Sequence, residues 1–395
     1  MPSWFVFTLL PLTALIALWA VKPLLTPRVR TYKHATDIRR LLNPSNMSLG
    51  DLLHARAVPN QRLVHAFGLT STFVSNDTKV HKAFTSSAKA LIAGAGDRDD
   101  RWRALARTAE ATAHRFLPAQ DIEFATLIQC ISFAVVLSAL FDTDLDTLRY
   151  DDVVYVTNII NQRWKDSKLK DAAAMRRDDS LRSLIAHIDR WVVDRDQYPN
   201  PLNFILPAYE TLWRVVAATV AYTYRCRDNA QHDAVVAFGK DATEGRFVSF
   251  GDDGRQPSMQ AIILEVLRLH PPTRHIARTS TPSGSWWHTH IAAAPAVEIA
   301  DIEGVHLSDE YGDNTSEFDP MRFHPSRMRA PRPELFSFGH GRLKCVAASW
   351  APMAAAVIAA TTVLQIDEAQ CTVTVGPRIG GRSGWEGWSV SKEAN

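Results

Sequence analysis

Apolar residues recur every three or four positions along most of the chain, the spacing that places them on one face of an α-helix. The segments with this pattern are residues 80–92, 101–116, 124–141, 152–168 and 181–193. Asp97, Asp99 and Asp100 come just before the second of them, where acidic residues favour the start of a helix. Helices are therefore expected to make up most of the protein.

Strand patterns are fewer and shorter. Residues 247–250 predict a short strand, and residues 296–300 alternate weakly between apolar and polar positions. Residues 371–375 and 385–390, with the pair Gly380-Gly381 between them, predict a hairpin near the C-terminus. The expected fold class is mainly α with minor β, and one catalytic domain is the simplest arrangement.

The first residues of the chain differ in pattern from the rest. Residues 3–21 contain no charged side chain and approach the length that crosses a bilayer. We expect residues 1–27 to be a membrane anchor, a single transmembrane helix ending in a proline hinge at Pro23 and Pro27. The basic residues that follow the apolar run place residues 28–395 in the cytosol. A cleaved signal peptide and a buried core helix are the alternatives, and the missing basic segment before the run argues against the first.

Composition narrows the functional classes. The 395 residues include 46% hydrophobic and 22% charged residues, and the formal net charge is only +2. This balance gives no reason to expect nucleic acid as a partner. The four cysteines are widely separated, which suits a reducing compartment and argues against a disulfide framework or a structural zinc site.

Cys345 is the most informative of these cysteines. It follows a glycine-rich loop and precedes an alanine-rich helical stretch, with Arg342 and Lys344 close by. The helix dipole and the two positive charges are expected to favour the thiolate. A thiolate in such a place can act as a nucleophile, bind a soft metal or serve as an axial ligand to haem iron.

Two helical segments carry charged side chains among apolar ones. In the first, Glu210 and Thr211 follow Pro207, which is expected to kink the helix and open a turn that could pass protons. In the alternative interpretation, Glu210 faces solvent and Thr211 bonds back to its own helix. In the second segment, Glu265 and Arg268 are three residues apart and can pair, either buried or at the surface.

These residues occur in an order that resembles the cytochrome P-450, or haem-thiolate, superfamily. The matching motifs are Glu265-x-x-Arg268, Phe318-x-Pro320-x-Arg322-Phe323, Phe338-x-x-Gly341-x-x-x-Cys345-x-Ala347 and the helical segment from Pro207 to Thr211. The sequence looks most like branches of the family found in filamentous fungi. The resemblance implies the cytochrome P-450 fold, a helical bundle around haem with small β-sheets, for residues 28–395, with a shortened N-terminal half.

The resemblance also implies a cofactor and its ligands. Cys345 would be the proximal axial ligand of the iron in haem b, Phe338 would pack near its sulfur, and Gly341 would permit the tight loop. Arg278 matches a position that often meets a haem propionate. Leu343 departs from the family, which usually places a basic propionate partner there, so fewer such partners are expected.

The remaining matched residues imply two further roles. Glu265, Arg268 and Arg322 would form a charged triad that supports the cysteine loop. Glu210 and Thr211 would line the distal side and deliver protons during dioxygen activation.

The function implied by the resemblance is that of a monooxygenase that inserts oxygen from O₂ into a lipophilic small molecule. A tailoring step in the biosynthesis of terpenoids, polyketides or alkaloids is expected. Its partners would be an NADPH-cytochrome P-450 reductase, which supplies electrons from NADPH through FAD and FMN, and cytochrome b5. The implied location is the endoplasmic reticulum membrane, single-pass, with the catalytic domain in the cytosol.

Three alternatives remain open at this stage. A cysteine–histidine nucleophile would use His340, although no third partner supports it. A haem-thiolate isomerase, cyclase or dehydratase would need no dioxygen. A catalytically inactive relic, serving as an interaction protein, is favoured by Leu343 and the short front half. His288 and His290 could suggest a metal pair, but a third ligand at suitable spacing is missing.

Overall fold

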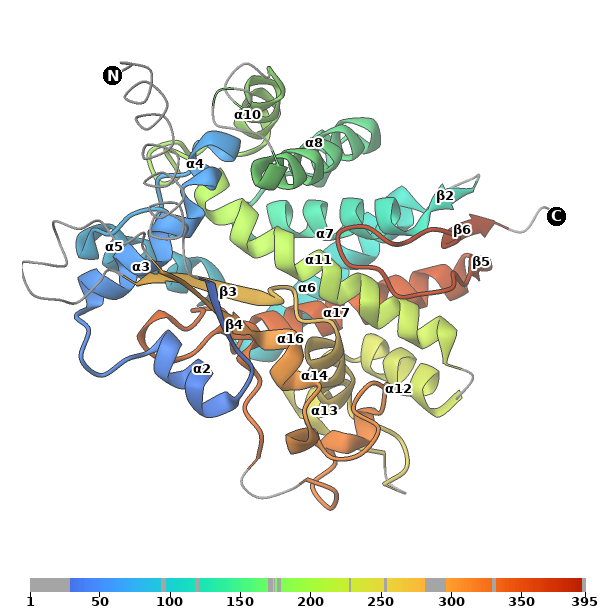
Figure 1. Cartoon of the computed structure of the whole chain (residues 1–395). Coiled ribbons are helices and arrows are strands. Elements are labelled where there is room, and N and C mark those ends of the chain that lie inside the picture. Colours follow the sequence, from blue (N-terminus) through green and yellow to red (C-terminus); the bar gives the residue numbers. More distant parts are fainter. Residues whose placement is uncertain are drawn as a thin grey trace, which may run out of the picture.

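The computed structural model describes residues 29–392 except residues 94–96, 118–120, 170–172, 174, 176–178, 227–228, 252–253, 281–295 and 329–331. The anchor and hinge predicted at residues 1–27, and the pair His288 and His290, lie outside the described residues. Helices dominate and two small sheets lie apart from each other (Figure 1). The predicted fold class, mainly α with minor β, is confirmed.

Four helices form the centre of the protein. They are α6 (Arg98–Phe116), α7 (Phe124–Phe141), α11 (Leu202–Arg225) and α17 (Ala351–Glu368). Helix α11 packs against α7 and α17, and α6 packs against the same two helices (Figure 1). Among the described residues α7 alone is long and apolar enough to cross a membrane, but 67% of it is buried inside the protein. A helix that is apolar on all sides and covered by others is a core helix.

The other α-helices surround this centre. They are α2 (Ala35–Leu42), α3 (Leu49–Asn60), α4 (Arg62–Phe67), α5 (Thr78–Ala93), α8 (Tyr150–Leu169), α10 (Ser180–Trp191), α12 (Asn229–Lys240), α13 (Glu244–Val248), α14 (Met259–Leu269) and α16 (Ile302–His306). All five segments predicted from the helical spacing are helices. Short 3₁₀ turns cover Leu145–Thr147, Asp309–Tyr311, Pro320–Phe323, Phe336–Phe338 and Gly341–Leu343.

The strands form two three-stranded sheets. The first has the order β1 (Val29–Tyr32), β4 (Ala296–Asp301), β3 (His275–Ser280), with β1 parallel and β3 antiparallel to β4. The second has the order β2 (Ile122–Glu123), β6 (Ser389–Lys392), β5 (Cys371–Thr374), and its pairs are antiparallel. The first sheet packs on α3, and so brings the N-terminal part of the chain against the segment after α14.

The strand predictions were less accurate than the helix predictions. The strand at residues 296–300 and the C-terminal hairpin are confirmed, although the second strand of the hairpin begins only at Ser389. The strand predicted at residues 247–250 is wrong, because α13 occupies Glu244–Val248. The Thr243 side chain accepts a hydrogen bond from the Arg246 amide and so caps the N-terminus of this helix. Phe247, which belongs to the helix, is buried. Strands β1 and β3 were not predicted.

Candidate functional site

The loop before Cys345 has a backbone that depends on glycine. Gly339 and Gly341 have φ angles of 72° and 68°, in the left-handed region that other residues rarely adopt. A Cβ atom on Gly341 would also lie only 2.2 Å from Cγ of Asn43. The loop then turns back so that the Cys345 amide donates to the Phe338 carbonyl at 2.9 Å. This geometry fixes the position of Cys345 at the start of the turn that leads into α17.

Cys345 is exposed as a residue, although its thiol is partly enclosed by protein, and its surroundings differ from the sequence prediction. Helix α17 begins six residues later at Ala351, so Cys345 does not lie at its first turn. Arg342 donates to Asn43 and to the carbonyls of Pro44 and Met47. Burial raises the pKa of the thiol, and a hydrogen bond from the Ala347 amide only partly opposes this. The expectation that the helix dipole and nearby charges lower this pKa is wrong. Since a metal-bound thiol is deprotonated outright, binding to a metal would supply the thiolate instead.

The cysteine loop is tied to the helix that carries Glu265 and Arg268. The Ser337 hydroxyl donates to the Leu267 carbonyl at 2.9 Å. The Phe336 amide donates to Nε2 of the fully buried His306 at 2.9 Å, and this bond requires a neutral imidazole. Burial lowers the pKa of His306 to about 4, which keeps the ring neutral at ordinary pH.

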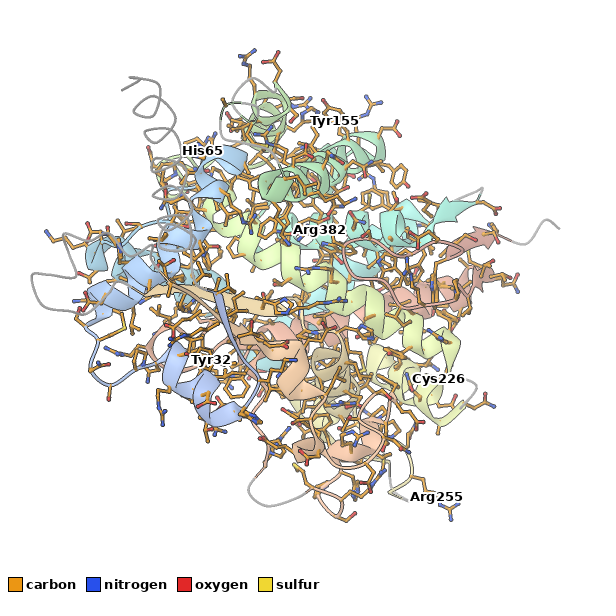
Figure 2. All side chains as sticks on the ribbon, in the orientation of Figure 1. Tyr32, His65, Tyr155, Cys226, Arg255 and Arg382 are labelled. Atoms are coloured by element: carbon orange, nitrogen blue, oxygen red, sulfur yellow. The ribbon has the colours of Figure 1, made fainter. Side chains whose placement is uncertain are left out.

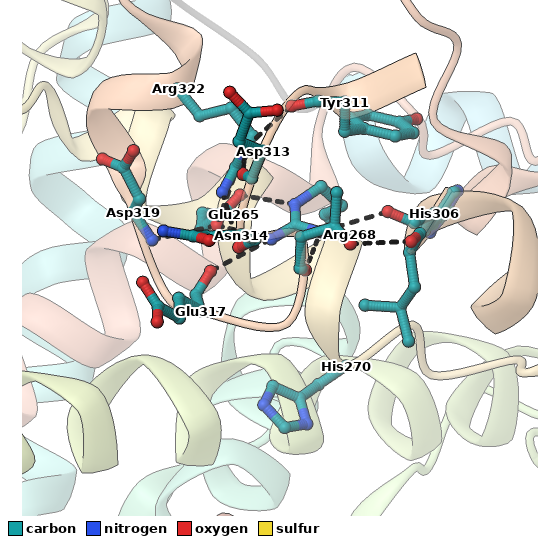
Figure 3. Close-up of polar contacts among 12 residues, drawn as sticks. Glu265, Arg268, His270, His306, Tyr311, Asp313, Asn314, Glu317, Asp319 and Arg322 are labelled. Carbon is teal, nitrogen blue, oxygen red and sulfur yellow. Dashed lines mark hydrogen bonds and ion pairs between the residues drawn. The ribbon is translucent and has the colours of Figure 1, made fainter. Parts of the chain in front are cut away.

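Glu265, Arg268 and Arg322 lie together in one buried network (Figure 3). Arg268 binds both carboxylate oxygens of Glu265 at 2.7 Å, and both side chains are fully buried. Nε of Arg322 lies 3.6 Å from the same carboxylate. This arrangement selects the buried alternative of the two that the sequence allowed for the pair.

Backbone carbonyls complete the network around the two arginines. Arg268 donates to the carbonyls of His306, Thr315 and Glu317 (Figure 3). Arg322 donates to carbonyls at residues 311, 313 and 314, and the Asp319 amide donates to Glu265. A buried ion pair is tolerated when hydrogen bonds saturate it in this way. The network therefore joins α14, the segment around His306 and the cysteine loop into one unit.

The acid–alcohol pair lies in the middle of α11, which runs through Pro207 as a single helix. Glu210 is 2% exposed and both of its carboxylate oxygens accept from Nη1 of Arg382, Oε2 at 2.6 Å. The alternative in which Glu210 faces solvent is therefore wrong. The Thr211 hydroxyl donates to the Pro207 carbonyl at 3.4 Å, as that alternative proposed for Thr211. The role of the two residues in proton delivery stays a prediction.

Arg278 lies on β3 beside a second buried arginine, Arg56 of α3, which the sequence did not reveal. Each is only 9% exposed, and Nε of each is buried without a hydrogen-bond partner in the described residues. Arg56 donates through Nη2 to the carbonyl and hydroxyl of Thr72, whose hydroxyl also contacts Nδ1 of His81. Burial and the charge of Arg278 lower the pKa of Arg56 to about 10.

These two guanidinium groups fit the anionic edge of haem. The two buried positive charges repel each other and have unsatisfied N–H groups. In the described part of the chain no carboxylate is bonded to either of them. Such a pair is stabilised by a bound anion. Haem carries two propionates, and its iron takes a thiolate such as that of Cys345. The residues present therefore fit a haem, which Cys345 would hold at the iron and Arg56 and Arg278 would hold at the propionates.

A cysteine–histidine nucleophile does not fit the same loop. Nδ1 of His340 bonds to Glu334 at 2.8 Å, and the described residues show no hydrogen bond between His340 and Cys345. Over the same residues no group of three potential metal ligands from His, Cys, Asp and Glu occurs.

Comparison with known proteins agrees with the site. The family model for cytochrome P450 matches residues 242–367, which include Glu265, Arg268, Arg322 and Cys345. Norfluorocurarine oxidase of Strychnos is 29% identical over 230 residues, covering 53% of this chain and 43% of that protein. Cyclooctatin synthase of Streptomyces melanosporofaciens is 27% identical over 204 residues, covering 50% and 43%. The chain spans less than half the length of the curated relatives it matches.

Solved structures match nearly the whole chain. Cyanobacterial CYP120A1 with retinoic acid bound has a TM-score of 0.63 at 13% identity, covering 92% of this chain and 88% of that one. CYP154A1 from Streptomyces coelicolor has a TM-score of 0.58 at 16% identity, covering 92% and 91%. At such low identity the likeness shows the fold alone, whereas the sequence match covers the cysteine loop and its charged network. Residues 242–367 are thus similar in sequence to the cytochrome P450 family, and the chain has the fold of the cytochrome P450 structures it matches.

Proposed function

We propose that the protein is a haem-thiolate monooxygenase that inserts one atom of dioxygen into a lipophilic small molecule. The observation that carries this proposal is the loop in which Gly339 and Gly341 precede Cys345, together with the buried network behind it. Bound to thiolate, haem supplies dioxygen activation and O–O bond cleavage. The protein contributes the ligand, the propionate partners and the proton path.

The biological setting is part of the proposal. Two of the relatives, norfluorocurarine oxidase and cyclooctatin synthase, support a tailoring step in secondary metabolism. Electrons would come from NADPH through a flavoprotein reductase, with cytochrome b5 as a second partner, docking on the side of exposed Lys344. The apolar segment at residues 1–27 supports an anchor in the endoplasmic reticulum membrane.

Thr211 provides the test that separates oxygenation from the reactions that need no dioxygen. Its hydroxyl lies on the same turn of α11 as Glu210, where the pair could relay protons. In the protein reconstituted with reductase and candidate metabolites, Thr211→Ala should keep NADPH oxidation but divert most of it away from product. The measurement is product formed per NADPH and per O₂ consumed.

Thr211→Ser is the matched control, because it keeps a hydroxyl at the same place and should stay coupled. Equal coupling in the alanine variant and the parent would remove Thr211 from proton delivery. Product formation that continues without O₂ would instead favour an isomerase, cyclase or dehydratase.

Arg56 should contribute measurably to haem retention, because it is a buried cation and Leu343 leaves a family position without one. A hydrogen bond to a charged group is worth about 1.5–3 kcal/mol. Arg56→Leu should therefore release haem roughly ten- to a hundredfold faster, measured by transfer to apomyoglobin. Arg107→Leu, at an exposed position of α6, is the control. Unchanged release from the Arg56 variant would contradict its assignment as a propionate partner.

A further inference from the structure

Trp164 lies between two guanidinium groups that come from distant parts of the chain. Cζ of Arg382 is 4.8 Å from the centroid of the indole ring, and Cζ of Arg62 is 5.3 Å from it. Arg62 is the first residue of α4, Trp164 lies on α8, and Arg382 belongs to the turn between β5 and β6. Figure 2 shows Arg382 between α8 and α11. Two like charges thus share one aromatic ring.

Both guanidinium groups also have N–H donors that make no hydrogen bond to the described residues. To the described residues, Arg382 donates through Nη1 alone, to Glu210 and to Asn161, and Arg62 donates through Nη1 alone, to the Ser167 hydroxyl. In the part of the chain that the structure describes, Nε and Nη2 of both arginines therefore carry no hydrogen bond. The Arg382 side chain is 13% exposed and Arg62 is half-buried, so neither group is sealed from solvent.

The charges around these arginines do not balance. Arg214, bonded to the Glu210 carbonyl, and Lys168 of α8 bring the number of cations to four. Burial lowers the pKa of Lys168, and so do the charges of Arg62, Arg382 and Arg214, while Glu210 is the only group that acts in the other direction. The neighbours Asn161 and Gln129 are neutral. Among the described charges that act on Lys168, one carboxylate thus stands against three arginines, and Lys168 is a fourth cation.

A purely structural role explains part of this arrangement. Arg382 neutralises the buried Glu210, and stacking on Trp164 stabilises both arginines. It does not explain Arg62, which has no carboxylate partner among the described residues, or the donors of both arginines that make no hydrogen bond to those residues. Planar guanidinium groups with free N–H pairs are the side chains that bind carboxylates in bidentate fashion.

We propose that Arg62 and Arg382 bind the carboxylate of an anionic, amphiphilic substrate beside Trp164. The proposal rests on the proposed monooxygenase function, since it names the substrate class for the same active site. Arg382 would bridge the substrate to Glu210 and so connect substrate binding to the turn of α11 that carries Thr211. The lipophilic molecule expected from the sequence would thereby carry an acidic end.

The test compares two probes that differ in charge. Dodecanoate and dodecanol are titrated into the haem-loaded protein, and dissociation constants are taken from the spin-state change of the haem and from calorimetry. Dodecanoate should bind roughly tenfold or more tightly than the alcohol. The difference in affinity between the two probes should fall as the salt concentration is raised, because the site is open to solvent. Arg62→Gln should remove most of that advantage, whereas Arg107→Gln at an exposed position of α6 should keep it.

Arg382→Gln alone leaves Glu210 buried without its partner and can unfold the protein. The double variant Arg382→Gln/Glu210→Gln removes both charges and should lose the preference for the acid while remaining folded. Equal affinity for the two probes, no binding of either, or an unchanged preference in Arg62→Gln would overturn the proposal. A reduced carbonyl complex with the spectrum of thiolate ligation would still support the proposed function in that case. Absence of that spectrum would refute the function itself.

Discussion

Replacing Cys345 with serine is expected to abolish the thiolate-type carbonyl spectrum of the reduced protein and all NADPH-dependent product formation. The loop holds this side chain at a defined place through the bond from its amide to the Phe338 carbonyl, and the substitution leaves that bond intact. Serine is nearly isosteric but does not give up its proton to become a comparable ligand. The change therefore removes the chemistry while leaving the fold, and haem stoichiometry with carbonyl spectra would measure it.

Cys371→Ser is the matched control for that experiment. Cys371 begins β5, and among the described residues its thiol makes only one hydrogen bond, which it donates to the carbonyl of Ala369 at 3.9 Å. This variant should keep the spectrum and the activity of the parent. If Cys345→Ser kept the same Soret band and carbonyl complex as the parent, Cys345 would not be the axial ligand and the proposed function would fail.

The helices could be predicted because their signal is local. A three- or four-residue period over a dozen residues identifies a helix whatever surrounds it, and α5, α6, α7, α8 and α10 all followed it. Strand β3 depends on its partner β4, and residues 247–248 of the predicted strand became the end of a helix that Thr243 caps. Four-residue patterns carry too little information to decide between these outcomes.

In the candidate site, too, some contacts follow from local sequence and others depend on the packing of distant segments. Glu265 and Arg268 are three residues apart on one helix, so their pairing follows from spacing alone. Arg56 meets Arg278, and Arg382 meets Glu210 172 positions away in sequence. Neither arginine stands in a motif, although Arg382 follows two glycines in the predicted hairpin. Only the packing of α3 on the first sheet, and of the hairpin turn on α11, brings these charges into place.

Removing the charge of Glu265 should cost the most stability of any single change in the buried network. Glu265→Gln leaves Arg268 and Arg322 without their carboxylate in a region where Glu265 and Arg268 are both 0% exposed. Breaking a buried ion pair from one side costs about 3–5 kcal/mol, against a total stability of about 5–15 kcal/mol for a folded protein. We expect a large shift of the denaturation midpoint in urea.

The same substitution should also lower haem content, because the network continues into the cysteine loop. Arg268 holds the His306 carbonyl, and His306 in turn accepts the amide of Phe336. The matched control is Asp100→Asn, which breaks an ion pair with Arg103 at the same three-residue spacing but on the surface. Exposed pairs contribute little, so its stability should stay near that of the parent. If Glu265→Gln matched this control in both stability and haem content, the buried network would not support the cysteine loop. Loss of stability with full haem content would separate the two roles and confine Glu265 to holding the fold.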